Sequence, residues 1–150
     1  MEIFSTKLIT ATTLLLIGLN FNLRAQIQKN NIYGDWQVDY EETLALQTDM
    51  AKQLFTHVPG EHKSAIQNDM SSRHIVYDTQ GSFQTLIGGE NIDGSWEWLS
   101  DSTTTFVSLD NGDQFKHRFI ETSGDHLIIQ LHEETDSTTL FHYWCLNKIN

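Results

Sequence analysis

The sequence predicts a mainly β domain, an eight-stranded up-and-down antiparallel β-barrel with a helical insert after its first strand. Three observations support this fold class. Short segments in which apolar and polar side chains alternate recur along most of the chain, and turn residues separate them. One stretch, Glu41 to Ser72, instead spaces its apolar residues as an amphipathic helix does. The pair Asn111-Gly112 stands between two alternating segments and is a strong hairpin signal.

The first residues have the layout of a secretory signal peptide. Lys7 precedes an uncharged run from Leu8 to Leu19, which is shorter than the about 20 apolar residues that span a bilayer. Ala25 is the small residue expected before a cleavage site. We therefore predict a signal peptide over residues 1–25 and one domain over residues 26–150, with an uncleaved membrane anchor as the alternative. Export predicts a periplasmic or extracellular protein without stable membrane insertion.

The chain is acidic and has a single cysteine. Its formal net charge is −11 at pH 7, so nucleic acids and anionic membrane surfaces should repel it, and no nucleic-acid partner is expected. A single cysteine, Cys145, excludes an internal disulfide. Cys145 stands in an apolar segment, which favours a buried, inert thiol over a reactive one.

The first predicted strand runs from Ile32 to Tyr40, where polar and apolar residues alternate. A helical hairpin is predicted to follow, with a break at Pro59-Gly60 and a second short helix from about Glu61. The face of the first helix that should be buried carries Leu44, Ala51, Leu54, Phe55 and Val58.

Seven further strands are predicted from Arg73 onward, the last over Thr138 to Leu146. Short turns join nearly all of them, which favours a meander. Closing the meander into a barrel removes both exposed edges, and an open sandwich is the alternative. The predicted inner face consists of Trp36, Val38, Tyr40, Ile75, Tyr77, Phe83, Ile87, Trp96, Trp98, Phe106, Phe115, Phe119, Leu127, Ile129 and Leu131.

Four segments resemble the lipocalin-like domains of small secreted bacterial proteins, especially those of Bacteroidetes. They are Ile32-Tyr33-Gly34-Asp35-Trp36, Tyr77-Asp78-Thr79-Gln80-Gly81-Ser82-Phe83, Gly94-Ser95-Trp96-Glu97-Trp98 and Leu127-Ile128-Ile129-Gln130-Leu131. The resemblance covers residues 32–146. It implies that Trp36 packs across the closed end of the barrel, and that the helical insert lies near the mouth, where it would act as a lid.

The predicted ligand-binding residues are the aromatic side chains of the inner face: Tyr77, Trp96, Trp98, Phe115, His117 and Phe119. His117 would be a polar group inside an apolar cavity, and Trp96, Trp98 and Tyr77 would form an aromatic wall that stacks on a flat or sugar-like ligand. Plain core packing of the same side chains is the alternative.

No metal centre, cofactor or catalytic residue is expected. His117, His132 and His142 fall on successive strands, but pairing about the turns places His117 opposite Leu131 and His142 near Ile128 or Ile129. These positions do not converge on one ion. The acidic turn from Asp110 to Asp113 is interpreted as a solvated hairpin turn, and no sequence motif of a nucleophilic or metal-dependent enzyme occurs.

Two functions are consistent with these features. The first is a secreted lipocalin-like protein that binds a small apolar or amphipathic ligand inside the barrel, and it requires a cavity. The second is an interaction protein with a solid barrel, which meets a protein partner through its helical insert or its acidic face. In that case Leu46, Met50 and Phe55 should be exposed apolar contacts.

Overall fold

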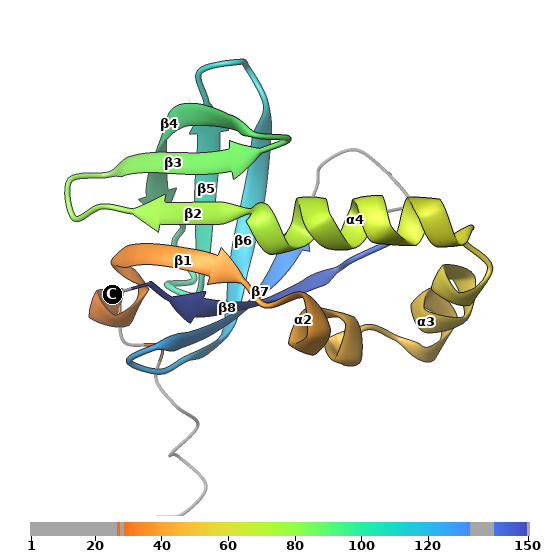
Figure 1. Ribbon diagram of the computed structural model, residues 1–150. Coiled ribbons are helices and arrows are strands. Elements are labelled where there is room, and N and C mark those ends of the chain that lie inside the picture. The colour runs from red at the N-terminus through yellow and green to blue at the C-terminus, as the bar shows by residue number, and fades with distance from the viewer. Residues whose placement is uncertain (1–26, 28, 133–139, 150) are drawn as a thin grey trace, which may run out of the picture.

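The computed structural model describes residue 27, residues 29–132 and residues 140–149. The predicted signal peptide and the predicted turn from Glu134 to Ser137 lie outside the described residues. Within them, eight antiparallel strands follow one another in sequence order and close into a barrel, so the predicted fold class is confirmed (Figure 1). The strands are β1 (Gly34–Val38), β2 (His74–Tyr77), β3 (Ser82–Ile87), β4 (Glu90–Trp98), β5 (Thr104–Leu109), β6 (Gln114–Thr122), β7 (His126–His132) and β8 (Tyr143–Lys148).

The insert between β1 and β2 consists of three helices, α2 (Tyr40–Leu46), α3 (Asp49–Thr56) and α4 (Gly60–Ser72). The predicted hairpin of two helices was wrong, because a further break occurs at Gln47 and Thr48. The side chain of Asp39 caps α2, and that of Thr48 caps α3 by accepting a hydrogen bond from the Ala51 amide. Two local caps therefore start two helices where the apolar spacing alone indicated one.

Side chains of α2 hold the insert against the first residues of β8. β1 pairs with β8 only as far as Leu146, which leaves the backbone at Cys145 and Tyr143 without a strand on that side. Thr43 accepts a hydrogen bond from the Cys145 amide at 2.9 Å, and the Gln47 amide donates to the Tyr143 carbonyl at 2.8 Å. Because Thr43 and Gln47 are both buried, these contacts replace the missing part of β1.

The barrel has a closed end and a mouth. At the closed end lie the 3-10 helix η1 (Lys29–Ile32), the start of β1, the end of β8 and the short turns after β2, β4 and β6. The Trp36 indole donates a hydrogen bond to the Ile32 carbonyl at 2.8 Å, so the tryptophan fixes η1 beneath the barrel. At the mouth lie the helical insert, the connections after β3 and β5, the end of β7 and the start of β8.

Two residues of the predicted inner face lie elsewhere. Phe106 pairs with Glu97 and Lys116 in the sheet, and the side chains of β5 that are buried inside are those of Thr105, Val107 and Leu109. The prediction at Phe106 was wrong because it placed the aromatic residue inside, although the alternation of β5 puts its neighbour Val107 inside and Phe106 outside. Tyr40 is the first residue of α2, not a strand residue.

The insert also differs from the prediction in which apolar side chains it exposes. Leu46 is 40% exposed and Met50 is 73% exposed, as the interaction-protein alternative requires. Phe55 is buried against Phe141, with ring centroids 6.0 Å apart, which agrees with its predicted place on the buried helix face and counts against its role as an exposed contact. Leu54, which was expected to be buried, is 59% exposed. Among the described helices, none combines the length and apolar character that crossing a membrane requires.

Candidate ligand-binding site

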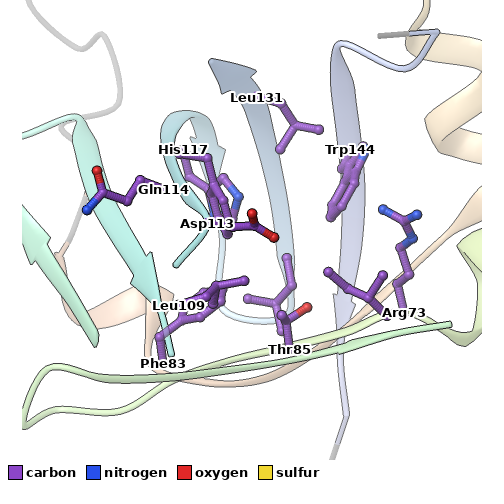
Figure 2. A pocket seen from close by; sticks show the side chains of 12 residues that line it. Arg73, Phe83, Thr85, Leu109, Asp113, Gln114, His117, Leu131 and Trp144 are labelled. Atoms are coloured by element: carbon purple, nitrogen blue, oxygen red, sulfur yellow. The ribbon is translucent and has the colours of Figure 1, made fainter. Parts of the chain in front are cut away.

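A cavity of about 340 Å³ lies inside the barrel at its mouth (Figure 2). Its wall comes from six of the eight strands, from Arg73 at the end of the helical insert, and from Asp113 in the β5–β6 turn. Most of the lining side chains are apolar. They are Ile75, Phe83, Ile87, Leu109, Phe115, Leu131 and Trp144, together with the polar residues Arg73, Thr85, Asp113, Gln114 and His117.

His117 is the most buried polar residue of the cavity wall. Only 2% of its surface is exposed, and its Nδ1 atom shares a short hydrogen bond with the hydroxyl of Tyr77. Burial lowers the pKa of His117 to about 3, so the imidazole is neutral at physiological pH. Burial likewise raises the pKa of Tyr77, which keeps its hydroxyl protonated. Since Nδ1 is engaged by Tyr77, a ligand in the cavity would meet the other ring nitrogen, Nε2.

Arg73 places a cationic group at the rim of the cavity. Its guanidinium lies over the ring of Trp144, 5.2 Å from the centroid, and Figure 2 shows the two side chains next to each other. Its Nη2 atom donates to Asp69 Oδ2 at 2.7 Å, which orients the side chain. The Arg73 side chain is 22% exposed and so remains accessible from the mouth.

The structure places only two of the six predicted ligand-binding residues in the cavity wall, Phe115 and His117. Tyr77 lies behind His117 and supports it through the hydrogen bond just described. Trp96, Trp98 and Phe119 belong to the closed half of the interior, where they pack against one another. The prediction selected the inner face correctly, but period-two alternation does not indicate how far along the barrel axis a side chain lies.

Aromatic rings fill the closed half of the barrel. Tyr77 is at the centre of this packing, with ring centroids 5.3 Å from Trp96, 5.8 Å from Phe119 and 5.2 Å from Phe83, all in edge-to-face or near-perpendicular geometry. Trp98 packs on Trp96 and Phe119 at 5.8 and 5.4 Å. Trp36, whose packing across the closed end the resemblance implied, is completely buried there.

Six residues of the cavity wall were not predicted to face it: Arg73, Thr85, Leu109, Asp113, Gln114 and Trp144. Thr85 is buried on the inner side of β3 between Phe83 and Ile87, so alternation on this strand gave the signal that could have found it. Trp144 was placed in the last predicted strand without an assigned face. Arg73 follows the last helix of the insert, and nothing in its local sequence indicates that it points to the mouth.

The predicted register was correct at one histidine and wrong at another. His117 pairs with Leu131, as expected. His142, however, stands beside Leu131, whose amide donates to the His142 carbonyl, and not beside Ile128 or Ile129. The structure also brings together three residues that the sequence analysis left apart, Glu42, His126 and Cys145, on the outer face of the barrel.

Cys145 is buried, as predicted, but it has polar partners. Its Sγ atom donates to Glu42 Oε2 at 2.9 Å and lies 2.9 Å from His126 Nε2. Burial, together with the hydrogen bond to Glu42, raises the pKa of the thiol above its usual value. In this arrangement the thiolate that a nucleophile requires is disfavoured.

Neither a protein-family model nor a curated protein matches this chain. Among solved structures, the chain is similar to a DUF4847 family protein from Bacteroides vulgatus, with 12% sequence identity and a TM-score of 0.45. The alignment covers 79% of this chain and 94% of that protein. The fold assignment therefore depends on the strand order of this chain itself, and the lipocalin-like family assignment stays a prediction.

Proposed function

We propose that this chain is an exported, lipocalin-like binding protein that holds a small apolar or amphipathic molecule in the mouth of its barrel. The observation that carries the proposal is the cavity of about 340 Å³, which falls at the lower end of the range of about 300–1,000 Å³ for small-molecule sites. An apolar wall with a few converging polar groups is the usual composition of such sites. Export remains part of the proposal and is supported by the predicted signal peptide.

The chemistry of the cavity wall favours a ligand with an apolar body and one polar or anionic group. Phe83, Phe115 and Trp144 offer aromatic surface to the body of the ligand. Neutral His117 offers one hydrogen-bonding nitrogen in the interior, and Arg73 offers a positive charge at the rim. A small aromatic or short-chain carboxylic acid would satisfy both polar groups, while its hydrocarbon part would replace water along the wall.

We propose binding and not catalysis, because the polar groups of the cavity can hold a ligand by hydrogen bonds but are not suited to activate a reacting group. His117 is neutral well below physiological pH, and its Nδ1 atom is engaged by an uncharged tyrosine instead of a carboxylate. A histidine that acts as a general base at neutral pH needs a pKa closer to 7.

The test is native mass spectrometry of the protein purified under mild conditions from its own host. A discrete added mass that is released on denaturation would identify the cargo. A cavity-filling variant, Leu131→Trp, should abolish the added mass, since Leu131 lines the cavity. The matched control is Trp98→Leu, which changes a tryptophan of the closed half and should retain the cargo.

A neutral naphthylamine dye tests the cavity even when the natural ligand is lost during purification. Its fluorescence should rise with one equivalent of wild-type protein and of Trp98→Leu, but not with Leu131→Trp. Equal dye binding by Leu131→Trp and wild type, or a lack of binding by all three folded proteins, would contradict a binding function of the cavity.

Exposed apolar side chains on the insert favour a second candidate, an interaction with a protein partner. Leu46, Met50 and Leu54 are 40%, 73% and 59% exposed and lie on the neighbouring helices α2 and α3. A partner that copurifies with the wild type and is lost when all three residues become glutamine would support this function. Retention of that partner by the triple variant would contradict it.

A further inference from the structure

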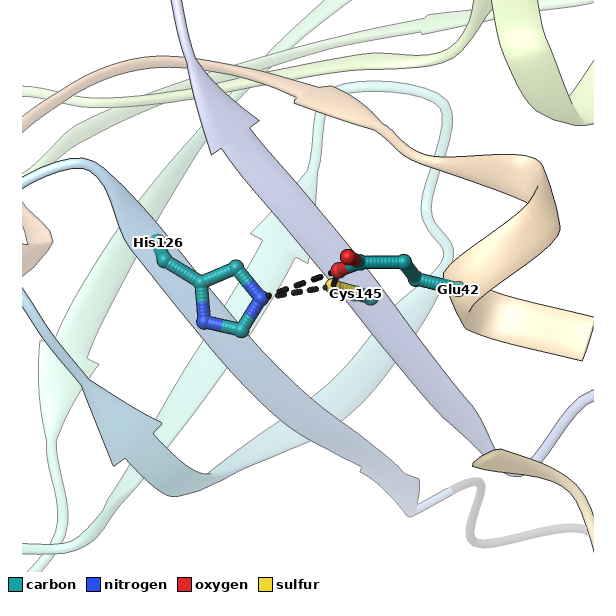
Figure 3. A group of neighbouring side chains, drawn as sticks. All are labelled: Glu42, His126 and Cys145. Carbon is teal, nitrogen blue, oxygen red and sulfur yellow. Dashed lines mark hydrogen bonds and ion pairs between the residues drawn. The ribbon is translucent and has the colours of Figure 1, made fainter. Parts of the chain in front are cut away.

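Three potential metal ligands meet on the outside of the barrel, where α2 packs against β8 next to the start of β7 (Figure 3). Cys145 Sγ is 2.9 Å from His126 Nε2 and 2.9 Å from Glu42 Oε2, and the latter two atoms are 3.3 Å apart. The cluster lies on the opposite side of the sheet from the cavity, because Trp144 and Leu146, the neighbours of Cys145, are buried inside the barrel.

Each of the three residues stands on a well-fixed element. Cys145 is in β8, where its amide and carbonyl bond to Thr43 and Asp39 of the α2 region. The same contacts set the position of α2 and therefore of Glu42, one residue before Thr43. His126 begins β7, which pairs with β8 over five residues. The cluster thus joins Glu42 of α2 to His126 and Cys145, which lie 84 and 103 residues further along the chain.

A fourth residue, Glu121, lies beside the histidine. Glu121 Oε1 lies 4.0 Å from His126 Nδ1, on the side of the ring away from Cys145. A carboxylate beside one ring nitrogen favours a proton there and leaves the other nitrogen to bind a cation, an arrangement that is common around histidine ligands. Here the nitrogen that faces Cys145 and Glu42 is Nε2.

Hydrogen bonds alone leave this triangle incompletely paired. With the imidazole proton on Nδ1, the thiol proton alone must serve the three close contacts between Sγ, Nε2 and a carboxylate oxygen. The carboxylates of Glu42 and Glu121 lie 3.3 and 4.0 Å from the two ring nitrogens of His126 and add negative potential around the cluster. A divalent cation would be attracted by this potential, and it would bind all three atoms and displace the thiol proton.

We propose that Glu42, His126 and Cys145 form a binding site for a zinc-like divalent cation. A cation about 1 Å outside the plane of the three atoms would lie about 2.0 Å from each, which is close to the bond lengths of zinc to nitrogen and oxygen and about 0.3 Å shorter than its bond to sulfur. In a regular tetrahedral site the ligand atoms are about 3.5 Å apart, so the two distances to Sγ would widen by about 0.6 Å and the distance between Nε2 and Oε2 by about 0.2 Å.

The ligand set and its exposure define the class of metal. Sulfur with nitrogen and one carboxylate oxygen suits Zn²⁺ or a similar borderline ion, and not Ca²⁺ or Mg²⁺, which prefer oxygen alone. The side chain of Glu42 is 59% exposed and that of His126 is 26% exposed, so an ion can enter from solvent and keep water as its fourth ligand.

The first experiment is a titration of the tag-free, chelator-treated protein with Co²⁺, which reports its ligands by absorbance. One equivalent should produce a near-ultraviolet thiolate-to-cobalt band and visible bands typical of four-coordinate cobalt. Cys145→Ser should lose the thiolate band. His126→Ala and Glu42→Gln should weaken cobalt binding by about 10-fold to 100-fold or more, and Glu121→Gln by about 10-fold.

Matched controls are available close to the cluster. Glu41→Gln changes the neighbouring exposed carboxylate, and His142→Ala changes an exposed histidine just before β8; both should bind cobalt as the wild type does. Should Cys145→Ser fail to fold, the partly exposed His126 still gives a decisive variant. A wild type without a thiolate band, or a band of equal affinity in His126→Ala, would overturn the proposed site.

Discussion

The two halves of the barrel interior are built from the same strands by the same alternation, yet one is filled and the other is hollow. On β6, Phe119 lies in the closed half and is 2% exposed, whereas Phe115, two inward positions earlier, borders the cavity. His117 stands between them at the boundary. The comparison shows that an inward-facing aromatic residue indicates a core position, but only its depth along the barrel decides whether it supports the fold or is available to a ligand.

Side-chain size explains much of the difference between the two halves. The closed half receives Trp36, Trp96 and Trp98, and η1 adds Ile32 from below. The mouth receives Thr85 and His117 at central positions of β3 and β6, where larger side chains would reach across the barrel. An eight-stranded barrel has room for one small ligand only where its side chains leave the centre open.

The largest expected effect comes from truncating the matched pair on β6. Phe119→Ala should lower the free energy of unfolding by about 3–5 kcal/mol, because Tyr77 and Trp98 pack on its ring and a void would remain. Phe115→Ala should cost only about 1–2 kcal/mol, since its ring already faces open space. Urea denaturation of both variants measures the difference, and equal losses would remove the distinction between the two halves.

The pH dependence of the free energy of unfolding tests whether His117, at the boundary between the two halves, is buried without a charge. In the unfolded chain a histidine titrates near pH 6.5, whereas burial lowers the pKa of His117 to about 3 in the folded protein. Between these values the unfolded state takes up a proton that the folded state does not, so stability falls as the pH falls, by up to about 1.4 kcal/mol per pH unit. Above pH 6.5 this group has no effect.

The variant His117→Gln isolates this contribution, because it keeps a polar partner for Tyr77 without a titrating group. Urea denaturation at pH 7 and pH 4.5 should show a smaller loss of stability for His117→Gln than for the wild type. An unchanged difference between the two pH values would indicate that His117 is solvated and that the cavity reaches further into the barrel.

A smaller effect is expected at the rim. Arg73→Gln should weaken binding of an anionic naphthalene dye about fivefold, about 1 kcal/mol, because the variant loses the charge above Trp144. Binding of the neutral dye should change much less, and fluorescence titration gives both affinities. An equal loss for both dyes would mean that Arg73 shapes the mouth and does not select charge.

The smallest effect is expected in a turn of the closed end. The Thr104 hydroxyl and the Thr103 amide donate hydrogen bonds to Asp101 and lower its pKa to about 2. The carboxylate therefore stabilises the fold above about pH 4, and this contribution is lost as the pH falls towards 2. Asp101→Asn should cost about 0.5–1 kcal/mol at pH 7, since the group is exposed, and should leave dye binding unchanged.

The fold was predictable because its signals are local. Alternation located most strands, and turns such as Asn111-Gly112 separated them. The position of the turn between β6 and β7 also gave the correct pairing of His117 with Leu131. The site was less predictable, because cavity, rim and metal-ligand cluster all depend on distances between residues far apart in the chain. Arg73 lies at the mouth because it follows the helical insert, and Glu42 lies beside Cys145 because the adjacent Thr43 bonds to the Cys145 amide. Neither contact leaves a pattern in the sequence.

The location of η1 and the end of β8 has a practical consequence for handling the molecule. Both lie at the closed end, opposite the cavity, and Lys148 of β8 contacts the ring of Trp36 there. The domain can therefore be attached at either end of its described residues to a surface linker, a fused reporter or an affinity resin. Attachment there would leave the mouth of the barrel facing the solution. Immobilised protein could therefore sample a mixture of metabolites without the support obstructing entry.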